Sequence, residues 1–360
     1  MRIDRRQMLL GGVGTLAAGA FPVSETSAQT AGGKLESTLV IRTTGGVFEA
    51  ALRKNFFDPF TKATGVKVVP VAASYGDMMA KATAMQTSGN VEWDIISPQY
   101  YELSKLSHLV EDLGDCSAMP NVASQGIPRA CGGHGVLYLT GGQVLAFDPQ
   151  TFKDRKPKSW ADFWDVKTFP GPRSLPNTGS PWANLIVSLI ADGVPADKLF
   201  PLDLDRAFAK LDAIKPHVSV WWKTGAQSQQ VMRQGDAVMN LMWSGTAYAT
   251  KKAGVPLDWS WTHAVADFGA WTILKNAPHP NAARAFIDFY MGNPENHAAF
   301  SREMGYSTSN KKGQELLTDE EKAELGAKPE IVEQIIIPDA DWLEKNRAMA
   351  LERWNRWLSA

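Results

Sequence analysis

The sequence lacks a charge excess of either sign. Lys and Arg number 37 against 38 Asp and Glu, which gives a formal net charge of -1, and no basic stripe stands out along the chain. Binding to nucleic acid depends on neutralising phosphates with clustered positive charge. We therefore expect no nucleic-acid partner.

The sequence also lacks the short motifs of common enzyme classes. It contains no G-x-S-x-G elbow, no H-E-x-x-H, no P-loop and no dinucleotide-binding fingerprint, and its six histidines are scattered without metal-ligand spacing. We expect a protein that is not an enzyme and that needs neither a metal nor another cofactor. An exported enzyme is kept only as a weaker alternative.

Only two cysteines are present, Cys116 and Cys131. In an oxidising compartment a disulfide that closes this short loop is the favoured state. The alternative is a catalytic cysteine paired with His134 of "CGGHG". Nearness in sequence is weak evidence for such a pair, because catalytic partners normally meet through the fold.

The first residues have the pattern of an export signal. Basic residues, among them the pair Arg5 and Arg6, precede a short Gly-rich apolar run that is too short to span a bilayer. Residues 1–28 are thus predicted to be a twin-arginine-like signal peptide cleaved after Ala28. Met8 stands where the twin-arginine pattern usually has Phe, so the general export route stays open. No later apolar run reaches transmembrane length, and a soluble periplasmic protein is expected.

The rest of the chain alternates between strand and helix patterns, which favours α/β architecture, and its length and 44% hydrophobic content suffice for two cores. "TLVIRT", "VKVVPVAA", "WDIISP", "AVMNLMW" and "FGAWTIL" read as strands. "GVLYLTGGQVLAFD" reads as two strands joined through Gly141 and Gly142, where the chain crosses between lobes. Ser180 is predicted to cap a helix with Pro181 in its first turn, and Thr318 with Glu321 forms a capping box.

Seven stretches resemble the spermidine/putrescine-binding family of periplasmic solute-binding proteins. In chain order they are "FDPFTKATGVKV", "WDIISPQYY", "SWADFWD", "MWSGTAYATKKAG", "AFIDFYMGNPE", "YSTSNKK" and "RWNRWL". The resemblance implies an α/β, two-lobed periplasmic binding protein of type II, with discontinuous lobes joined by hinge strands. The first lobe would comprise residues 35–142 and 269–313, and the second residues 143–268 and 314–360.

The resemblance also implies the function. The protein would be the periplasmic substrate-binding component of an ABC importer, a monomer that closes its lobes on a small nitrogenous solute and delivers it to a permease in the inner membrane. A ferric-ion carrier of the same fold, with tyrosinate ligands, is an alternative. Tyr100 and Tyr101 are the chain's one tandem tyrosine pair, but they lie elsewhere than in such carriers.

The family's ligand-binding residues are only partly matched. Trp243 matches a Trp that follows a strand of the second lobe, and Tyr100 matches an aromatic residue after "DIIS". Thr44 and Val47 stand where the family has Trp and Tyr, and the acid expected in the returning strand aligns with Gly269, two residues beyond Asp267. Both ends of a polyamine need a carboxylate, because burying an unpaired ammonium costs several kcal/mol. The sequence therefore departs from a polyamine site.

"TTGG" and "NTGS" each precede a predicted helix, and such starts offer free N–H groups and a positive dipole end to an anion. We therefore expect a ligand with an anionic group, an amino acid or amino-carboxylate rather than a diamine. The predicted ligand contacts are Thr44, Gly45, Gly46, Gln99, Tyr100, Thr178, Ser180, Trp243 and Asp267.

Each of these residues has a plainer interpretation. Trp243 could cap a core, Asp267 could pair at the hinge, and the residues at the helix starts could be simple turns. If Tyr100 and Tyr101 are extended they face opposite ways, so only one can point into the cleft. Arg173 in "PGPRSLP" could clamp a carboxylate or lie on the surface, and Trp271 is expected in the core.

Overall fold

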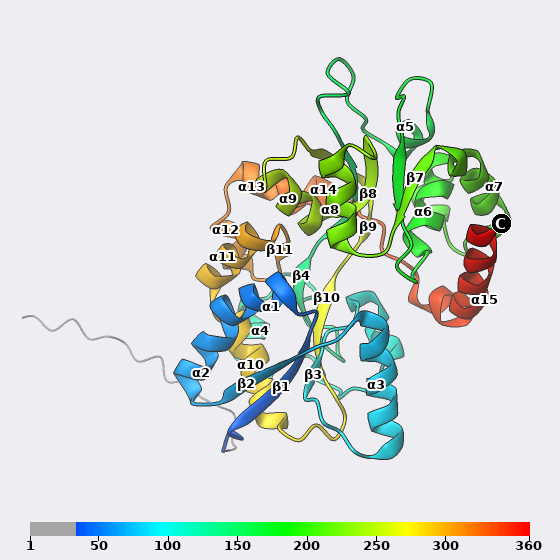
Figure 1. The fold of residues 1–360 in the computed structure, drawn as a ribbon. Helices are drawn as coiled ribbons and strands as arrows, with labels where there is room; N and C mark the ends of the chain where they lie inside the picture. The colour runs from blue at the N-terminus through cyan, green and yellow to red at the C-terminus, as the bar shows by residue number, and fades with distance from the viewer. Residues whose placement is uncertain (1–33) are drawn as a thin grey trace, which may run out of the picture. The chain divides into compact units, whose positions relative to one another are not determined.

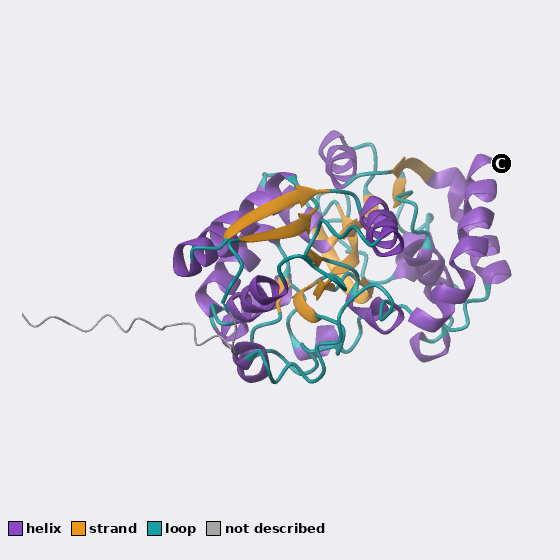
Figure 2. Cartoon of the chain, turned by 90° about the horizontal axis from the view of Figure 1, so that it is seen from below, coloured by secondary structure: helices purple, strands orange, loops and turns teal. Residues whose placement is uncertain are grey.

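Two mixed β-sheets organise the protein, and each has helices on both faces (Figure 1). The computed structural model describes residues 34–360, so the predicted signal peptide lies outside the described residues. Figure 2 shows the strands flanked by helices in a second view. Within the described residues no helix combines the length and the apolar character that a membrane span requires.

The first sheet has six strands, in which β1, β2 and β3 are parallel and the returning strand β10 runs antiparallel to β3 and β4. In spatial order they are β11 (Ser307–Thr308), β4 (Val136–Thr140), β10 (Gly269–Ile273), β3 (Ile95–Ile96), β1 (Thr38–Thr43) and β2 (Lys67–Ala72).

The second sheet has five strands, in which β6 is parallel to β7 and β8 while β5 is antiparallel to β8 and β9. In spatial order they are β7 (Val218–Trp222), β6 (Arg173–Pro176), β8 (Met239–Trp243), β5 (Gly142–Phe147) and β9 (Asp258–Ala266).

The helices associated with the first sheet are α1 (Gly46–Leu52), α2 (Asp58–Thr64), α3 (Tyr75–Ser88), α4 (Pro120–Gln125), α10 (Pro280–Met291), α11 (Pro294–Met304) and α12 (Lys311–Glu315). A π-turn over Arg53–Phe57 joins α1 to α2 without a break, and a 3-10 helix covers Tyr100–Lys105. Apolar side chains of α1, α2 and α10 pack on one face of the sheet, and those of α3 pack on the other.

The helices associated with the second sheet are α5 (Trp160–Trp164), α6 (Trp182–Ala191), α7 (Leu204–Ile214), α8 (Gly225–Gln234), α9 (Ser244–Lys252), α13 (Asp319–Glu324), α14 (Pro329–Val332) and α15 (Ala340–Ser359). Short 3-10 turns cover Ala196–Lys198 and Lys215–His217. The core of α5, α6, α7 and α15 lies on one face, and α8 and α9 pack on the other.

The chain passes between the two sheets three times. Gly141 separates β4 from β5, and Asp267 with Phe268 separates β9 from β10. The backbone N–H of Asp267 donates to the carbonyl of Gly141 at 3.1 Å, which joins these two crossings directly. After β11 the chain returns to the second sheet, where Ile336 bridges Val265. The predicted crossing through "TGG" and the return through "FGAWTIL" are thereby confirmed.

Several local predictions are confirmed. Thr318 and Glu321 form the capping box of α13, and Trp271 is buried in the first core. Two others are wrong. Pro181, not Ser180, is the N-cap residue of α6, and no side chain caps that helix. Tyr100 and Tyr101 lie in a 3-10 turn rather than an extended strand, because β3 ends already at Ile96.

Candidate ligand-binding site

Asp267 lies at the crossing from the second sheet to the first. The Gln99 side-chain amide donates to its Oδ1 at 2.9 Å, and Gln99 Oε1 accepts from the N–H of Phe268 at 3.1 Å. Within residues 34–360 Asp267 takes part in no ion pair, since no Lys, Arg or His nitrogen lies within 4.0 Å. Burial raises the pKa of Asp267, and the bond from Gln99 only partly offsets this. The carboxylate therefore lacks the cation that would normally accompany it.

Three tyrosine hydroxyls lie within the electrostatic influence of Asp267, and they come from separate parts of the chain. Tyr101 belongs to the 3-10 turn after β3, Tyr138 to β4, and Tyr306 precedes β11. Burial raises the pKa of each hydroxyl, and the negative charge of Asp267 raises it further. A carboxylate among aromatic rings is a favourable setting for an ammonium group, which ring faces and negative charge both attract.

The two tandem tyrosines lie in different surroundings. The Tyr100 hydroxyl donates to the carbonyl of Arg129, and its ring packs against the first core. Tyr101 instead packs against the second core and feels the charge of Asp267. The tandem pair is therefore not presented together, as the tyrosinates of a ferric-ion site would be.

Trp243 ends β8 and precedes α9. It pairs with Gln143 of β5, and its ring meets Trp222 edge to face with centroids 4.9 Å apart. Trp222 is fully buried, whereas Trp243 is only partly buried. One side of the Trp243 ring is thus supported by the second lobe, while part of it stays accessible.

The two predicted helix starts differ in detail. Gly45 and Gly46 have φ of 73° and 59°, a left-handed backbone that favours glycine, and a Cβ at Gly45 would lie 3.0 Å from the Cβ of Ala72. Thr44 is exposed, and Thr178 and Ser180 are partly buried before α6. Neither α1 nor α6 has a side-chain N-cap, so no side chain of the described residues occupies the N–H groups of their first turns.

Arg42, which the sequence interpretation passed over inside an apolar strand, is a second charged group without a counter-ion. It lies on β1 with 2% exposure, and its guanidinium donates to Ser97 Oγ at 3.0 Å and to the Ala73 carbonyl at 2.5 Å. Its buried Nε has no partner among the described residues. Burial lowers the pKa of Arg42, and the hydroxyls of Tyr138 and Tyr75 partly offset this. A lone Arg within a strand was the signal that could have identified it.

Arg173 has neither of the roles considered for it. It is buried at 0% exposure on β6, and its guanidinium donates to the carbonyls of Phe163 at 3.1 Å, Gly171 at 2.5 Å and Phe169 at 2.5 Å. These bonds fix the α5–β6 connection. Arg173 is therefore an internal structural residue rather than a clamp or a surface group.

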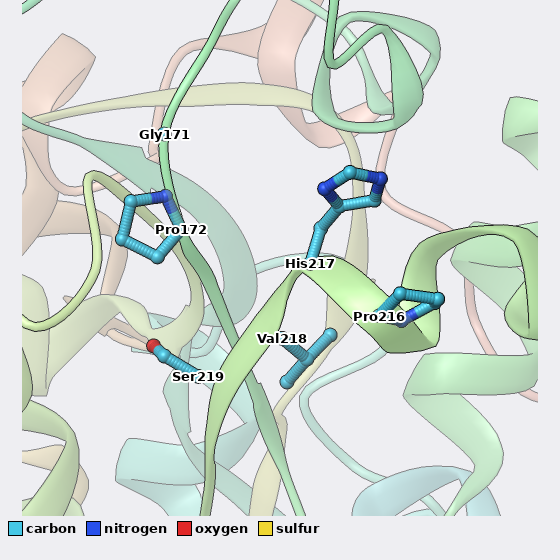
Figure 3. Close-up of a pocket in the computed structure, with 6 residues that line it drawn as sticks. All are labelled: Gly171, Pro172, Pro216, His217, Val218 and Ser219. Carbon is cyan, nitrogen blue, oxygen red and sulfur yellow. The ribbon is translucent and has the colours of Figure 1, made fainter.

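A shallow pocket lies elsewhere, at the start of β6 and β7 (Figure 3). It is lined by Gly171, Pro172, Pro216, His217, Val218 and Ser219. The Ser219 hydroxyl lies 2.6 Å from the Asp236 carbonyl and 3.1 Å from that of Arg173, so backbone groups already engage it. Ligands of such sheets bind beyond the carboxyl ends of strands, and this pocket lies at the amino ends.

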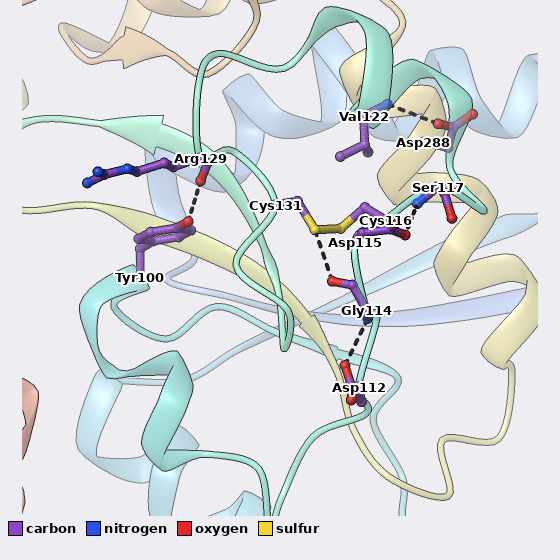
Figure 4. Close-up of a disulfide and its surroundings, with 10 residues drawn as sticks. All are labelled: Tyr100, Asp112, Gly114, Asp115, Cys116, Ser117, Val122, Arg129, Cys131 and Asp288. Atoms are coloured by element: carbon purple, nitrogen blue, oxygen red, sulfur yellow. Dashed lines mark hydrogen bonds between the residues drawn. A yellow bond between two sulfur atoms is a disulfide. The ribbon is translucent and has the colours of Figure 1, made fainter.

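Cys116 and Cys131 are joined by a disulfide (Figure 4). No free cysteine remains in the described part of the chain. His134 contacts the Glu111 carbonyl through Nδ1 at 3.3 Å instead. The alternative of a catalytic Cys–His pair is therefore wrong.

Comparison with known proteins gives a consistent result. Residues 55–330 match the family described as "Bacterial extracellular solute-binding protein". The chain is 34% identical over 330 residues to the gamma-aminobutyric acid-binding protein of Pseudomonas aeruginosa, covering 89% of this chain and 91% of that protein. It is 21% identical to the spermidine/putrescine-binding periplasmic protein of Salmonella typhimurium, covering 80% of each.

Among solved structures, the open unliganded form of the binding protein AttC from Agrobacterium tumefaciens superposes with a TM-score of 0.72 at 36% identity. The alignment covers 90% of this chain and 100% of that one. The chain therefore belongs to the bacterial extracellular solute-binding protein family, and it is a two-lobed solute-binding protein of an ABC transporter rather than an enzyme.

Proposed function

We propose that the protein binds a small linear amino-carboxylate of the gamma-aminobutyrate (GABA) type between its lobes. The observation that carries this proposal is Asp267, which lies where the lobes meet and has no cationic partner among residues 34–360. The 34% identity to a gamma-aminobutyric acid-binding protein supports the same class of ligand.

The ammonium end of the ligand would pair with Asp267. Gln99 holds one carboxylate oxygen, and Tyr101, Tyr138 and Tyr306 supply the surrounding rings. An ammonium here would replace the missing counter-charge and make charge-assisted hydrogen bonds. Tyr101 takes the role that the sequence interpretation gave to Tyr100.

The carboxylate end would be stabilised by Arg42 and the two uncapped helix starts, at Thr44–Gly46 in the first lobe and Thr178–Ser180 in the second. The guanidinium of Arg42 carries a positive charge that no carboxylate of the described residues balances. A polyamine suits this arrangement poorly, because Arg42 would repel its second ammonium. The nearby acid Glu102 cannot serve that ammonium, since Arg347 and Tyr75 already bind its two oxygens.

Trp243 would cover the ligand from the second lobe. We assign residues 35–142 and 269–313 to the first lobe and residues 143–268 and 314–360 to the second. The division of the strands between the two sheets supports this assignment, except that Gly142 begins β5 of the second sheet. A ligand that touches both Asp267 and Trp243 would favour the closed arrangement, because it binds that state better than the open one.

Calorimetric titration with a matched series of ligands tests the proposal. GABA carries both end groups, butyrate lacks the ammonium and butylamine lacks the carboxylate. We expect GABA to bind and each truncated ligand to bind at least about 100-fold more weakly, because each leaves one buried charge unpaired. Tight binding of putrescine without binding of GABA would overturn the proposal.

We further propose that the mature protein is an exported periplasmic monomer, released by cleavage after Ala28, which delivers its ligand to an inner-membrane ABC permease. The periplasmic location named for the polyamine-binding relatives supports this. Mass spectrometry of the protein from a periplasmic extract would test the cleavage site.

A further inference from the structure

The stretch after Trp243 is built around contacts between the lobes. Ser244 is buried, and its Oγ accepts from the N–H of Gly142 at 3.3 Å, at the first crossing of the chain. Gly245 follows in the first turn of α9. Its φ lies outside the left-handed region, so backbone conformation is not the reason for glycine here. Glycine is required here because another side chain lies too close for a Cβ.

That neighbour is the ring of Tyr306, which comes from the first lobe. A Cβ built on Gly245 would overlap the ring and would lie 2.7 Å from the carbonyl oxygen of Met304. A Cβ built on Gly141 would lie 2.5 Å from Cδ1 on the other edge of the same ring. The Tyr306 ring is therefore seated between a crossing of the chain and the first turn of a second-lobe helix.

A reciprocal contact lies beside it. Tyr248 of α9 packs its ring over Gly305, the left-handed residue that ends α11, and a Cβ there would overlap the Tyr248 side chain. The Tyr248 hydroxyl and the Lys252 ammonium donate to the carbonyl of Arg302, at 2.8 and 3.0 Å. Figure 1 shows α9 beside α11. A tyrosine of each lobe thus packs against a glycine of the other lobe.

We propose that this pair of tyrosine–glycine contacts is the pivot of lobe closure, with Tyr306 as the positioning residue that fixes Trp243 relative to Asp267. Trp243 is two residues from Gly245, and the Tyr306 ring packs on Gly141, whose carbonyl accepts from the N–H of Asp267 at 3.1 Å. Contact of a ring with bare backbone is non-directional, so the two ring contacts can persist while the lobes rotate. The bonds from Tyr248 and Lys252 to the Arg302 carbonyl would have to lengthen or break in the same motion. The proposal concerns the motion of the lobes and does not depend on which ligand binds.

Pulsed electron double resonance on the unliganded protein tests the pivot. Spin labels are attached at Ala84→Cys in α3 and Ala213→Cys in α7, two exposed positions on helices of different lobes, without reductant so that the native disulfide stays closed. Gly245→Ala should displace the distance distribution between the labels, because the added methyl group forces the Tyr306 ring out of its seat. An unchanged distribution in folded Gly245→Ala would overturn the proposal.

Three further variants make the test specific. Gly76→Ala is the matched control, because Gly76 is also helical and a Cβ there meets nothing within 4 Å. It should leave the distribution unchanged, as should Tyr306→Phe, which keeps the ring. Tyr306→Leu removes the ring from between Gly141 and Gly245 without creating a clash, and it should broaden the distance distribution. This variant tests the proposal even if Gly245→Ala fails to fold. A wild-type distribution for Tyr306→Leu would equally overturn the pivot.

A titration with GABA adds a second readout. If Gly245→Ala lowers the fraction of molecules able to close, the apparent Kd should rise in proportion, by about tenfold for a tenfold lower fraction. Because this arm depends on the proposed function, failure of the wild-type protein to bind GABA would count against that function. It would leave the label distances, and hence the pivot, as they are.

Discussion

Each lobe contains a buried arginine, and the two arginines differ in their hydrogen bonding. Arg173 in the second lobe donates to three carbonyl oxygens, and all of its nitrogens have partners. Arg42 in the first lobe has two partners and a buried Nε without one. Neither arginine is paired with a carboxylate among the described residues, so charge alone does not separate them. The two arginines differ in how many guanidinium nitrogens have a hydrogen-bond partner. The nitrogen of Arg42 that has none within residues 34–360 indicates a place for a ligand.

A fully buried aspartate, Asp94, and a partly buried one, Asp267, repeat this contrast. Asp94 is completely enclosed and accepts from the N–H of Val40 at 2.7 Å and from the N–H of His279 at 2.8 Å, and the imidazole of His279 adds a contact at 2.9 Å. Asp267 accepts from the side chain of Gln99 alone. Asp94 fastens β3 to β1 and to the start of α10. The Asp267 carboxylate links fewer elements, so its charge is available to a ligand.

The largest expected effect comes from removing the saturated arginine. Arg173→Met would leave three carbonyl groups buried without donors, and we expect a loss of at least about 3 kcal/mol in the free energy of unfolding. Arg42→Met should cost much less, because it also removes an unpaired buried donor. Urea unfolding of both variants measures this difference. Equal losses in the free energy of unfolding would contradict the proposed difference between the two arginines.

Next comes the unpaired aspartate. Asp267→Asn should weaken GABA binding by about 100-fold or more, since it removes the counter-charge of the ammonium. It should not destabilise the unliganded protein. The pKa of Asp267 is raised by folding, so its charged form costs stability above the unfolded-state pKa, and that cost disappears as the pH falls through the raised pKa.

The matched variant is Asp94→Asn, which should lower the free energy of unfolding because it weakens three hydrogen bonds at once. Calorimetry for affinity and thermal melting for stability together decide the outcome. A marked drop in the melting temperature of unliganded Asp267→Asn would show that Asp267 is structural after all.

An intermediate effect should follow pH through His297. This imidazole is buried between the Tyr290 carbonyl and the Thr308 hydroxyl, and burial lowers its pKa to about 3. The unfolded chain binds the proton below about pH 6.5, whereas the folded protein does not. Stability should therefore fall by up to about 1.4 kcal/mol per pH unit below that value. Urea midpoints compared between the wild type and His297→Gln isolate this contribution, and an identical pH dependence would contradict it.

The smallest effect is expected for the ion pair between Glu102 and Arg347, which links the 3-10 turn of the first lobe to α15 of the second. Arg347 is 40% exposed, and Glu102, although buried, keeps the hydrogen bond from the Tyr75 hydroxyl, so we expect Arg347→Met to cost about 1 kcal/mol. Added salt should weaken the pair in the wild type and have less effect on the variant. Melting temperatures at low and high ionic strength measure this. If Arg347→Met leaves the salt dependence of the melting temperature unchanged, that dependence arises from other charges.

The sequence predicted the fold well where a strand is buried on both faces. "TLVIRT" and "AVMNLMW" are nearly continuous apolar runs, and both are central strands. It missed β6, because prolines flank "RSL" and suggested a loop. It also misjudged the tyrosine pair, since an early turn after Ile96 removes the alternation on which the choice of Tyr100 depended.

The candidate site was harder to predict than the fold, for a physical reason. Asp267, Tyr138 and Tyr306 meet only because strands far apart in the chain are neighbours in one sheet. No local pattern encodes that proximity. Gly245 shows the same limit. No local pattern indicates that the ring of Tyr306 fills the space beside it.

The three crossings have a consequence for biosynthesis. The first core needs side chains from Leu39 to Phe300, and the second needs side chains from Leu145 to Trp354. Neither core can form from the part of the chain made early, so folding on the ribosome one lobe at a time is blocked by topology. The chain should stay open until almost all of it has been synthesised, which would favour its recognition by chaperones.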